Sequence, residues 1–152
     1  MGTTYGDSYT MVGEYGAWLK TFPWDLFATL TFDQRRGHDS AASRERKLGD
    51  YLISLERHSR AQVRCFWSEE KRNSRWSGCG QAGIAPHFHM LLACDRKRLE
   101  PLHSQLIWEG IAGRADVRIY DANRNAAEYC AKLIGLSNAN YGFHGFPKSA
   151  AA

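Results

Sequence analysis

Several segments of the chain alternate hydrophobic and polar positions with a period of two. In residues 26–32 the odd-numbered positions, Phe27, Thr29 and Thr31, fall on one side and the even-numbered positions on the other. Residues 63–70, 87–93 and 115–120 are further short segments of β-forming composition. Such segments are typical of strands in a sheet. We therefore predict four strands.

Helical periodicity fills the intervals between these strands. Residues 40–59 place Leu48, Tyr51, Leu52 and Leu55 on one stripe, and residues 96–110 turn Leu99, Leu102, Leu106 and Ile107 inward. A third helix, capped by Asp121 or Asn123, is expected to run to about residue 134. Before the first strand we expect a loose arm over residues 1–12 and a short helix over residues 14–21, which Pro23 limits.

The predicted order is β-α-β-β-α-β followed by a helix. This order indicates an α+β fold, the ferredoxin-like split βαβ, with an antiparallel sheet, helices on one face and the other face left for a site. We divide the chain into an N-terminal arm and short helix (1–25), a main domain (26–137) and a C-terminal tail (138–152). The tail is expected either to add an edge strand or to fold back on the sheet.

Composition sets limits on the function. The 152 residues suffice for one domain, and no apolar run is long enough to span a bilayer. No signal peptide is recognisable at the start, so we expect a cytoplasmic protein without a membrane partner. Lys and Arg number 20 against 16 Asp and Glu, a net charge of +4 that permits a polyanionic partner without requiring one. The four cysteines form no CxxC pair.

Two histidines flank one residue at the start of the third predicted strand. The period of two places His87 and His89 on one face, opposite Phe88, where two imidazoles can bind one metal ion. A surface pair without a ligand is the simpler interpretation of this pattern alone. The preceding strand ends in Glu69-Glu70, and a hairpin brings that end beside the histidines. Strand parity favours Glu70 as the third ligand, and Glu69 remains the alternative because a bulge would reverse the parity.

One carboxylate and two imidazoles with open positions indicate a catalytic metal site, suited to Mg²⁺ or Mn²⁺ if phosphate oxygens complete it. The third helix carries Tyr129 and Lys132, which lie three residues apart and so on one face. The simpler interpretation of Tyr129 alone is a core aromatic, and that of Lys132 alone is a solvated charge.

Three segments together resemble the motifs of a known enzyme family. Phe27-Ala28-Thr29-Leu30-Thr31-Phe32, then Pro86-His87-Phe88-His89-Met90-Leu91-Leu92, then Glu128-Tyr129-Cys130-Ala131-Lys132 occur in this order. They resemble the three motifs of single-tyrosine HUH endonucleases, the rolling-circle replication initiator (Rep) proteins. The resemblance covers residues 27–135. It departs from the compact hairpins of viral members in the long glycine-containing loop between Glu70 and Pro86.

The resemblance implies a function and roles for residues. The main domain would be an HUH endonuclease that nicks single-stranded DNA, at an origin or hairpin, and later rejoins it. His87, His89 and Glu70 would hold Mn²⁺ or Mg²⁺, Tyr129 would form a 5′-phosphotyrosine link, and Lys132 would position the phosphate or the metal. No Walker A motif is present, so a helicase would come from another chain or domain. If the protein is viral rather than bacterial, it would be located in the nucleus or the cytoplasm.

DNA contacts are expected from side chains near the predicted site. The candidates are Arg35, Arg36, Lys71, Arg72, Arg75 and Arg124 for the backbone, and Trp76 for stacking on a base. For any single arginine, a solvated surface charge is the simpler interpretation.

Three alternatives remain open on the sequence. A single-strand DNA transposase or a relaxase would use similar chemistry on a related fold. A non-catalytic single-stranded DNA- or RNA-binding module would share the sheet without the reaction. Cys79 together with His87 and His89 would instead bind zinc, although Cys79 has no partner cysteine nearby.

Overall fold

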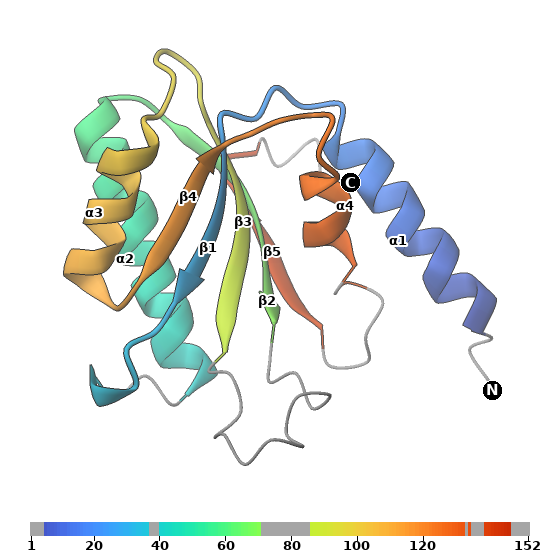
Figure 1. The fold of residues 1–152 in the computed structure, drawn as a ribbon, viewed down its shortest axis with the longest axis horizontal. Coiled ribbons are helices and arrows are strands. Elements are labelled where there is room, and N and C mark those ends of the chain that lie inside the picture. Colours follow the sequence, from blue (N-terminus) through green and yellow to red (C-terminus); the bar gives the residue numbers. More distant parts are fainter. Residues whose placement is uncertain (1–4, 37–39, 71–85, 133, 135–138, 147–152) are drawn as a thin grey trace.

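A computed structural model describes residues 5–36, 40–70, 86–132, 134 and 139–146 (Figure 1). The predicted DNA contacts Lys71, Arg72, Arg75 and Trp76, and the alternative zinc ligand Cys79, lie outside these residues. In chain order, the elements are α1 (Tyr5–Leu19), β1 (Leu26–Thr31), η1 (Gln34–Arg36), α2 (Ala41–Ser59), β2 (Val63–Glu70), β3 (His87–Cys94), α3 (Pro101–Ile111), β4 (Ala115–Ile119), α4 (Ala126–Ala131) and β5 (Asn140–His144).

The five strands form one antiparallel sheet in the order β4-β1-β3-β2-β5. The first four strands and helices α2 and α3 give the β-α-β-β-α-β order of the ferredoxin-like fold, which confirms the predicted α+β class. Strand β3 lies in the centre, with β1 on one side and β2 on the other. This central place puts the start of β3 between the ends of two neighbouring strands.

Helices α2 and α3 cover one face of the sheet (Figure 1). The even-numbered β1 residues Leu26, Ala28 and Leu30 are fully buried against them, as the alternation predicted. At the centre of this core, the fully buried Trp108 of α3 donates its indole N–H to the carbonyl of Thr31 at 2.9 Å. This hydrogen bond from a buried side chain to the backbone fixes α3 against the end of β1.

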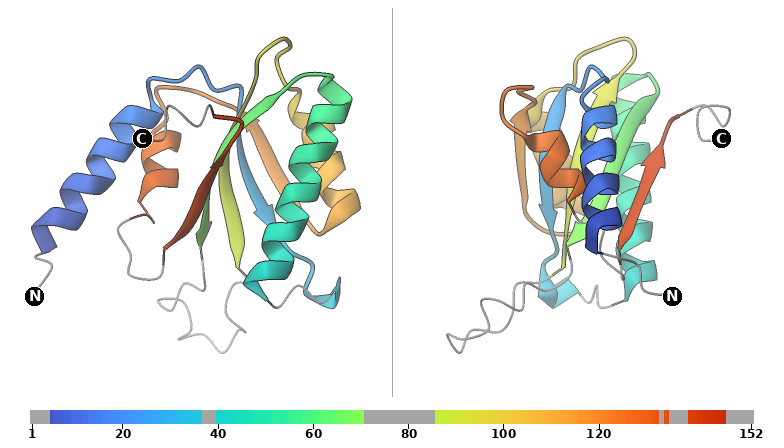
Figure 2. Two further views of the ribbon diagram at one scale, coloured as in Figure 1. Left: turned by 180° about the vertical axis from the view of Figure 1, so that it is seen from behind. Right: turned by 90° about the vertical axis from the view of Figure 1, so that its right-hand side faces the viewer.

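The opposite face is only partly free, because α1 and α4 pack on it (Figure 2). Phe66 of β2 and Leu91 of β3 point to this side and are fully buried. Two large apolar side chains in the middle of a sheet face require cover, which α1 and α4 supply. Gly16 of α1 lies so close to α4 that a β-carbon there would contact Glu128 at 3.2 Å.

Three helices differ from their predicted limits. Helix α1 begins at Tyr5, so the expectation of a loose arm was wrong for residues 5–12. No proline interrupts residues 5–19, and Leu19 anchors the helix in the apolar cluster on the Phe66 and Leu91 side of the sheet. Helix α3 begins at Pro101, a favoured first position, and it turns Ser104 and Trp108 inward. Leu102 and Leu106, predicted to face the core, are 67% and 57% exposed.

Helix α4 is shorter than predicted. Asp121 accepts a hydrogen bond from the backbone N–H of Asn123 at 2.9 Å and so forms a turn before the helix. Neither of the two predicted caps starts the helix, which is preceded by Asn125. The helix therefore runs only from Ala126 to Ala131, and Lys132 directly follows it.

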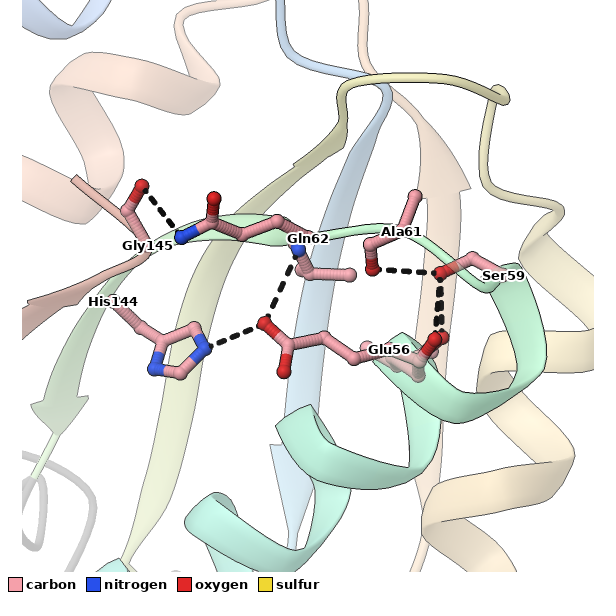
Figure 3. A network of polar contacts seen from close by, with 8 residues as sticks. Glu56, Ser59, Ala61, Gln62, His144 and Gly145 are labelled. Atoms are coloured by element: carbon pink, nitrogen blue, oxygen red, sulfur yellow. Dashed lines mark hydrogen bonds and ion pairs between the residues drawn. The ribbon is translucent and has the colours of Figure 1, made fainter. Parts of the chain in front are cut away.

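The C-terminal segment adds an edge strand, one of the two predicted possibilities. β5 pairs with β2, and Gly142 lies under the Trp67 ring, where a β-carbon would come within 2.9 Å of ring atoms. At the end of β5 the Glu56 carboxylate lies 2.9 Å from His144 Nε2 and accepts the backbone N–H of Val63 at 3.2 Å (Figure 3). This network ties β5, the start of β2 and the end of α2 together. No helix among the described residues has the length and apolar character needed to cross a membrane.

Candidate active site

The predicted histidines lie on the face of β3 that α1 and α4 leave partly open. His87 faces Thr31 of β1 and Glu70 of β2 across the sheet, and His89 faces Thr29 and Ser68. The residue between them, Phe88, is fully buried on the α2 and α3 side. The period of two therefore separates the polar pair from the core.

The Glu70 carboxylate lies between the two imidazoles. One carboxylate oxygen, Oε2, is 3.0 Å from His87 Nε2 and 2.7 Å from His89 Nε2. The side chain of the neighbouring Glu69 lies on the opposite face of the sheet, which α2 covers. There its Oε1 pairs with Arg44 Nη2 at 2.6 Å and its Oε2 accepts from Asn140 at 2.6 Å. The structure thus places Glu70, and not Glu69, beside the histidines; no bulge reverses the register of this strand end.

The three side chains form a group that could hold a metal ion. One donor atom from each of Glu70, His87 and His89 can be chosen so that all lie within 4.8 Å of one another. Two imidazole nitrogens and a carboxylate oxygen are a donor set found around Mn²⁺ and other divalent ions, with positions left for substrate or water. On the far side of the ring, His89 Nδ1 lies 3.3 Å from the hydroxyl of Thr29.

Burial and charge set the protonation of this group. Burial lowers the pKa of His89 to about 4, although the hydrogen bond to Glu70 opposes this shift. Burial alone would raise the pKa of Glu70, but the hydrogen bond from His89 and the positive charge of Lys132 outweigh it, so the pKa lies below its ordinary value. At neutral pH the site therefore presents a neutral His89 ring and an ionised carboxylate, the forms in which these side chains bind metals.

Helix α4 brings Tyr129 to the histidines. Its ring meets the ring of His89 edge-on, with centroids 4.7 Å apart, and the ring of Phe27 at 6.3 Å. The Nζ atom of Lys132 lies 3.7 Å from the centroid of the Tyr129 ring. Tyr129 is 40% exposed, which is compatible with access from solvent. The two predicted catalytic residues thus adjoin the histidine group.

An open groove of about 1030 Å³ runs beside these residues. Its walls come from β1, β3, β4, the turn after β4 and α4. They include Phe27, Thr29, His87, His89, Asp116, Arg118, Tyr120, Asn123, Arg124, Asn125 and Tyr129. The groove combines aromatic, basic and amide side chains, and aromatic and basic groups are those that contact the bases and backbone of single-stranded nucleic acids.

Three of the residues predicted to contact DNA lie in the described part of the chain. Arg124 lines the main groove and is exposed, at 3.7 Å from Asp121. Arg35 and Arg36 lie on η1, beyond the end of β1, around a smaller cavity of about 420 Å³ that Arg114 also lines. Both cavities are lined by β1 residues, because Thr29 lies in the first and Thr31 in the second.

Sequence reasoning missed Arg114 and Arg118. Arg118 faces the groove from β4, opposite Phe27 of β1, and makes a 2.7 Å ion pair with Asp116. A signal was present, because the period of two in β4 places Asp116 and Arg118 on the side opposite the buried Val117. Arg114 precedes the strand, and no pattern in the sequence marks its neighbourhood with Arg35 and Arg36.

Comparisons of the chain with protein-family models, with curated proteins and with solved structures found no match.

Proposed function

We propose that this chain is a metal-dependent endonuclease that nicks single-stranded DNA and rejoins it through a covalent 5′-phosphotyrosine link on Tyr129. One observation carries the proposal: Tyr129 lies against His89 of the Glu70–His87–His89 group, within one open groove. The resemblance of the three motifs to HUH replication initiators supports the same conclusion. Initiation of rolling-circle replication is the role that we propose for the reaction.

The reaction needs an attacking oxygen, a leaving oxygen and neutralisation of the phosphate charge. The Tyr129 hydroxyl attacks phosphorus and loses its proton to solvent, a P–O bond to tyrosine forms, and the bond from phosphorus to the 3′-oxygen breaks. The leaving 3′-oxygen takes a proton from water and ends as a hydroxyl. Attack by a 3′-hydroxyl on the phosphotyrosine reverses these steps and rejoins the strand.

The side chains of the site fit these needs. Glu70, His87 and His89 would hold Mg²⁺ or Mn²⁺, and Lewis-acid stabilisation of the charge on the phosphate oxygens is the chemistry that such an ion supplies when bound. The Lys132 ammonium, at 3.7 Å from the Tyr129 ring centroid, adds positive charge where the phenol oxygen becomes negative. Arg118 and Arg124 line the groove in which the DNA backbone would lie.

The test is trapping of the covalent adduct. The protein is incubated with a randomised single-stranded DNA pool and Mn²⁺, with and without EDTA, and adducts are separated on denaturing gels and mapped by peptide mass spectrometry. We expect an adduct on Tyr129 that EDTA abolishes and that Tyr129→Phe lacks. Tyr120→Phe, which removes another phenol from the same groove, is the matched control and should retain the adduct.

The same experiment separates the alternatives. DNA that binds but is never cleaved, with binding unaffected by EDTA, would identify a non-catalytic binding module and refute the enzyme. Sequencing of trapped ends gives the cut site, and a cut-site sequence that belongs to the hairpin ends of a mobile element rather than to a replication origin would favour the transposase.

A further inference from the structure

Two hydroxyl side chains flank His89, one from each neighbouring strand. Thr29 of β1 and Ser68 of β2 are its partners across the sheet. Only the Thr29 hydroxyl reaches the ring, at 3.3 Å from Nδ1. The Ser68 hydroxyl is buried and has no hydrogen-bond partner within the described part of the chain. The structure therefore offers one hydroxyl that contacts the imidazole and one that does not.

We propose that Thr29 is a positioning residue, whose hydroxyl holds the His89 ring so that Nε2 points to the metal position beside Glu70. This inference rests on the proposed function, because it assigns a second contact to a ligand of the proposed metal. It adds a residue whose effect passes through His89. Metal-binding histidines generally donate their other ring N–H to a fixed oxygen, which orients the ring and sets the nitrogen that binds.

The aromatic packing around His89 does not by itself determine the orientation of the ring. Phe27 stacks parallel to the ring at 6.4 Å between centroids, and Tyr129 meets it edge-on at 4.7 Å. These apolar contacts fix the plane of the ring but distinguish poorly between two orientations related by a half-turn of the ring. A half-turn would exchange each nitrogen with a carbon, so the polar partners at the two nitrogens, Glu70 at Nε2 and Thr29 at Nδ1, together select the orientation in which Nε2 faces Glu70.

A hydroxyl suits both states of the ring. Without a metal, the ionised Glu70 oxygen at 2.7 Å can only accept, so Nε2 carries the hydrogen and Nδ1 accepts from Thr29. Were a metal bound at Nε2, that nitrogen would supply its lone pair, the hydrogen would reside on Nδ1, and the Thr29 oxygen would accept it. The hydrogen would pass between the two nitrogens by exchange with water, so the ring would stay neutral. A carboxylate or carbonyl in place of Thr29 could only accept and would pair with one of these states.

The test uses variants of the two hydroxyl residues. Thr29→Val has nearly the same shape and strand preference but no hydroxyl, Thr29→Ser restores a hydroxyl, and Ser68→Ala removes the hydroxyl that makes no contact. The Mn²⁺ dissociation constant is measured by the electron paramagnetic resonance signal of free Mn²⁺ at pH 7.5, and urea unfolding verifies that each variant is folded. We expect Thr29→Val to weaken binding by about 10-fold or more, and Thr29→Ser and Ser68→Ala to stay within about threefold of the unmodified protein.

A second measurement reports the ring itself. The ¹⁵N signals of His89, recorded without metal and with Mg²⁺, identify which nitrogen carries the hydrogen. In the unmodified protein we expect the hydrogen on Nε2 without metal and on Nδ1 with Mg²⁺; in Thr29→Val the metal-free preference should weaken. Unchanged Mn²⁺ affinity and unchanged ¹⁵N signals in Thr29→Val would overturn the inference and leave the proposed function standing. Absence of Mn²⁺ binding to the unmodified protein would refute the metal site and the inference with it.

Discussion

The neutral His89 ring should make the stability of the metal-free protein depend on pH. Its side chain is only 4% exposed, and burial lowers its pKa to about 4. In the unfolded chain the pKa of a histidine is about 6.5. Between these values the unfolded chain binds more protons than the folded protein, so stability is greatest above pH 6.5 and falls as the pH decreases.

The size of the effect follows from the two pKa values. At pH 5 the unfolded ring is almost fully protonated, whereas the folded ring carries about a tenth of a proton. At about 1.36 kcal/mol per pKa unit, lowering the pH from 7.5 to 5 removes about 2 kcal/mol from the free energy of unfolding through this one ring. The lowered pKa of Glu70 keeps that carboxylate ionised over the same range, so it adds little to the change.

The assay is urea unfolding in EDTA at pH 7.5, 6 and 5. His89→Gln keeps an amide that can hydrogen-bond Glu70 but cannot titrate. Its free energy of unfolding should therefore fall by about 2 kcal/mol less than that of the unmodified protein over this range. Ser68→Ala, at the neighbouring cross-strand position, should retain the full dependence. If His89→Gln and the unmodified protein lose the same amount of stability, the ring is not held neutral by burial and the reasoning is wrong.

Two further predictions concern the framework of the site. Gly113→Ala would place a β-carbon against the carbonyl oxygen of Thr31 and should lower the free energy of unfolding, measured with urea, by about 1–3 kcal/mol. Gly49→Ala, with open space around it in α2, should raise it by about 0.5–1 kcal/mol; equal effects would contradict the close contact at Gly113. Glu69→Ala removes a carboxylate that pairs with the buried Arg44 and accepts from Asn140, and it should lower the free energy of unfolding by about 2–3 kcal/mol. The Mn²⁺ affinity of the folded fraction should be kept; loss of metal binding without loss of stability would mean that Glu69, and not Glu70, is the ligand.

The strand pattern was readable from the sequence because side-chain direction in a strand depends only on parity. The alternation from Leu26 to Phe32 predicted which side is buried, and counting along β2 placed Glu70 on the side of the histidines. These relations need no knowledge of distant segments. The contacts of Thr29 with His89 and of Arg44 with Glu69 depend on register and helix packing, which no local pattern specifies.

The helices were harder to predict, because their limits depend on what they pack against. The start of α1 at Tyr5 was missed, since the glycines of this segment suggest a loose arm and one ring that Tyr15 packs against, that of Tyr141, lies far along the chain. The buried face of α3 was misassigned because Leu102 and Leu106 fit a helical stripe, whereas the inward position of Trp108 depends on its hydrogen bond to β1. The catalytic role of Lys132 and the metal binding by Glu70, His87 and His89 stay predictions.

The packing of α1 has a consequence for the order in which the protein matures on the ribosome. The ring of Tyr15 contacts that of Tyr141, and Gly16 adjoins Glu128 of α4. At a translation rate of about 5–20 residues per second, these partners are synthesised on the order of 6–25 s after α1. Contacts between such distant segments form slowly. The helix that carries Tyr129 is therefore fixed against α1 only after residues 126–131 have been synthesised, so nascent chains that end before these residues would have the histidine strand but not the docked tyrosine.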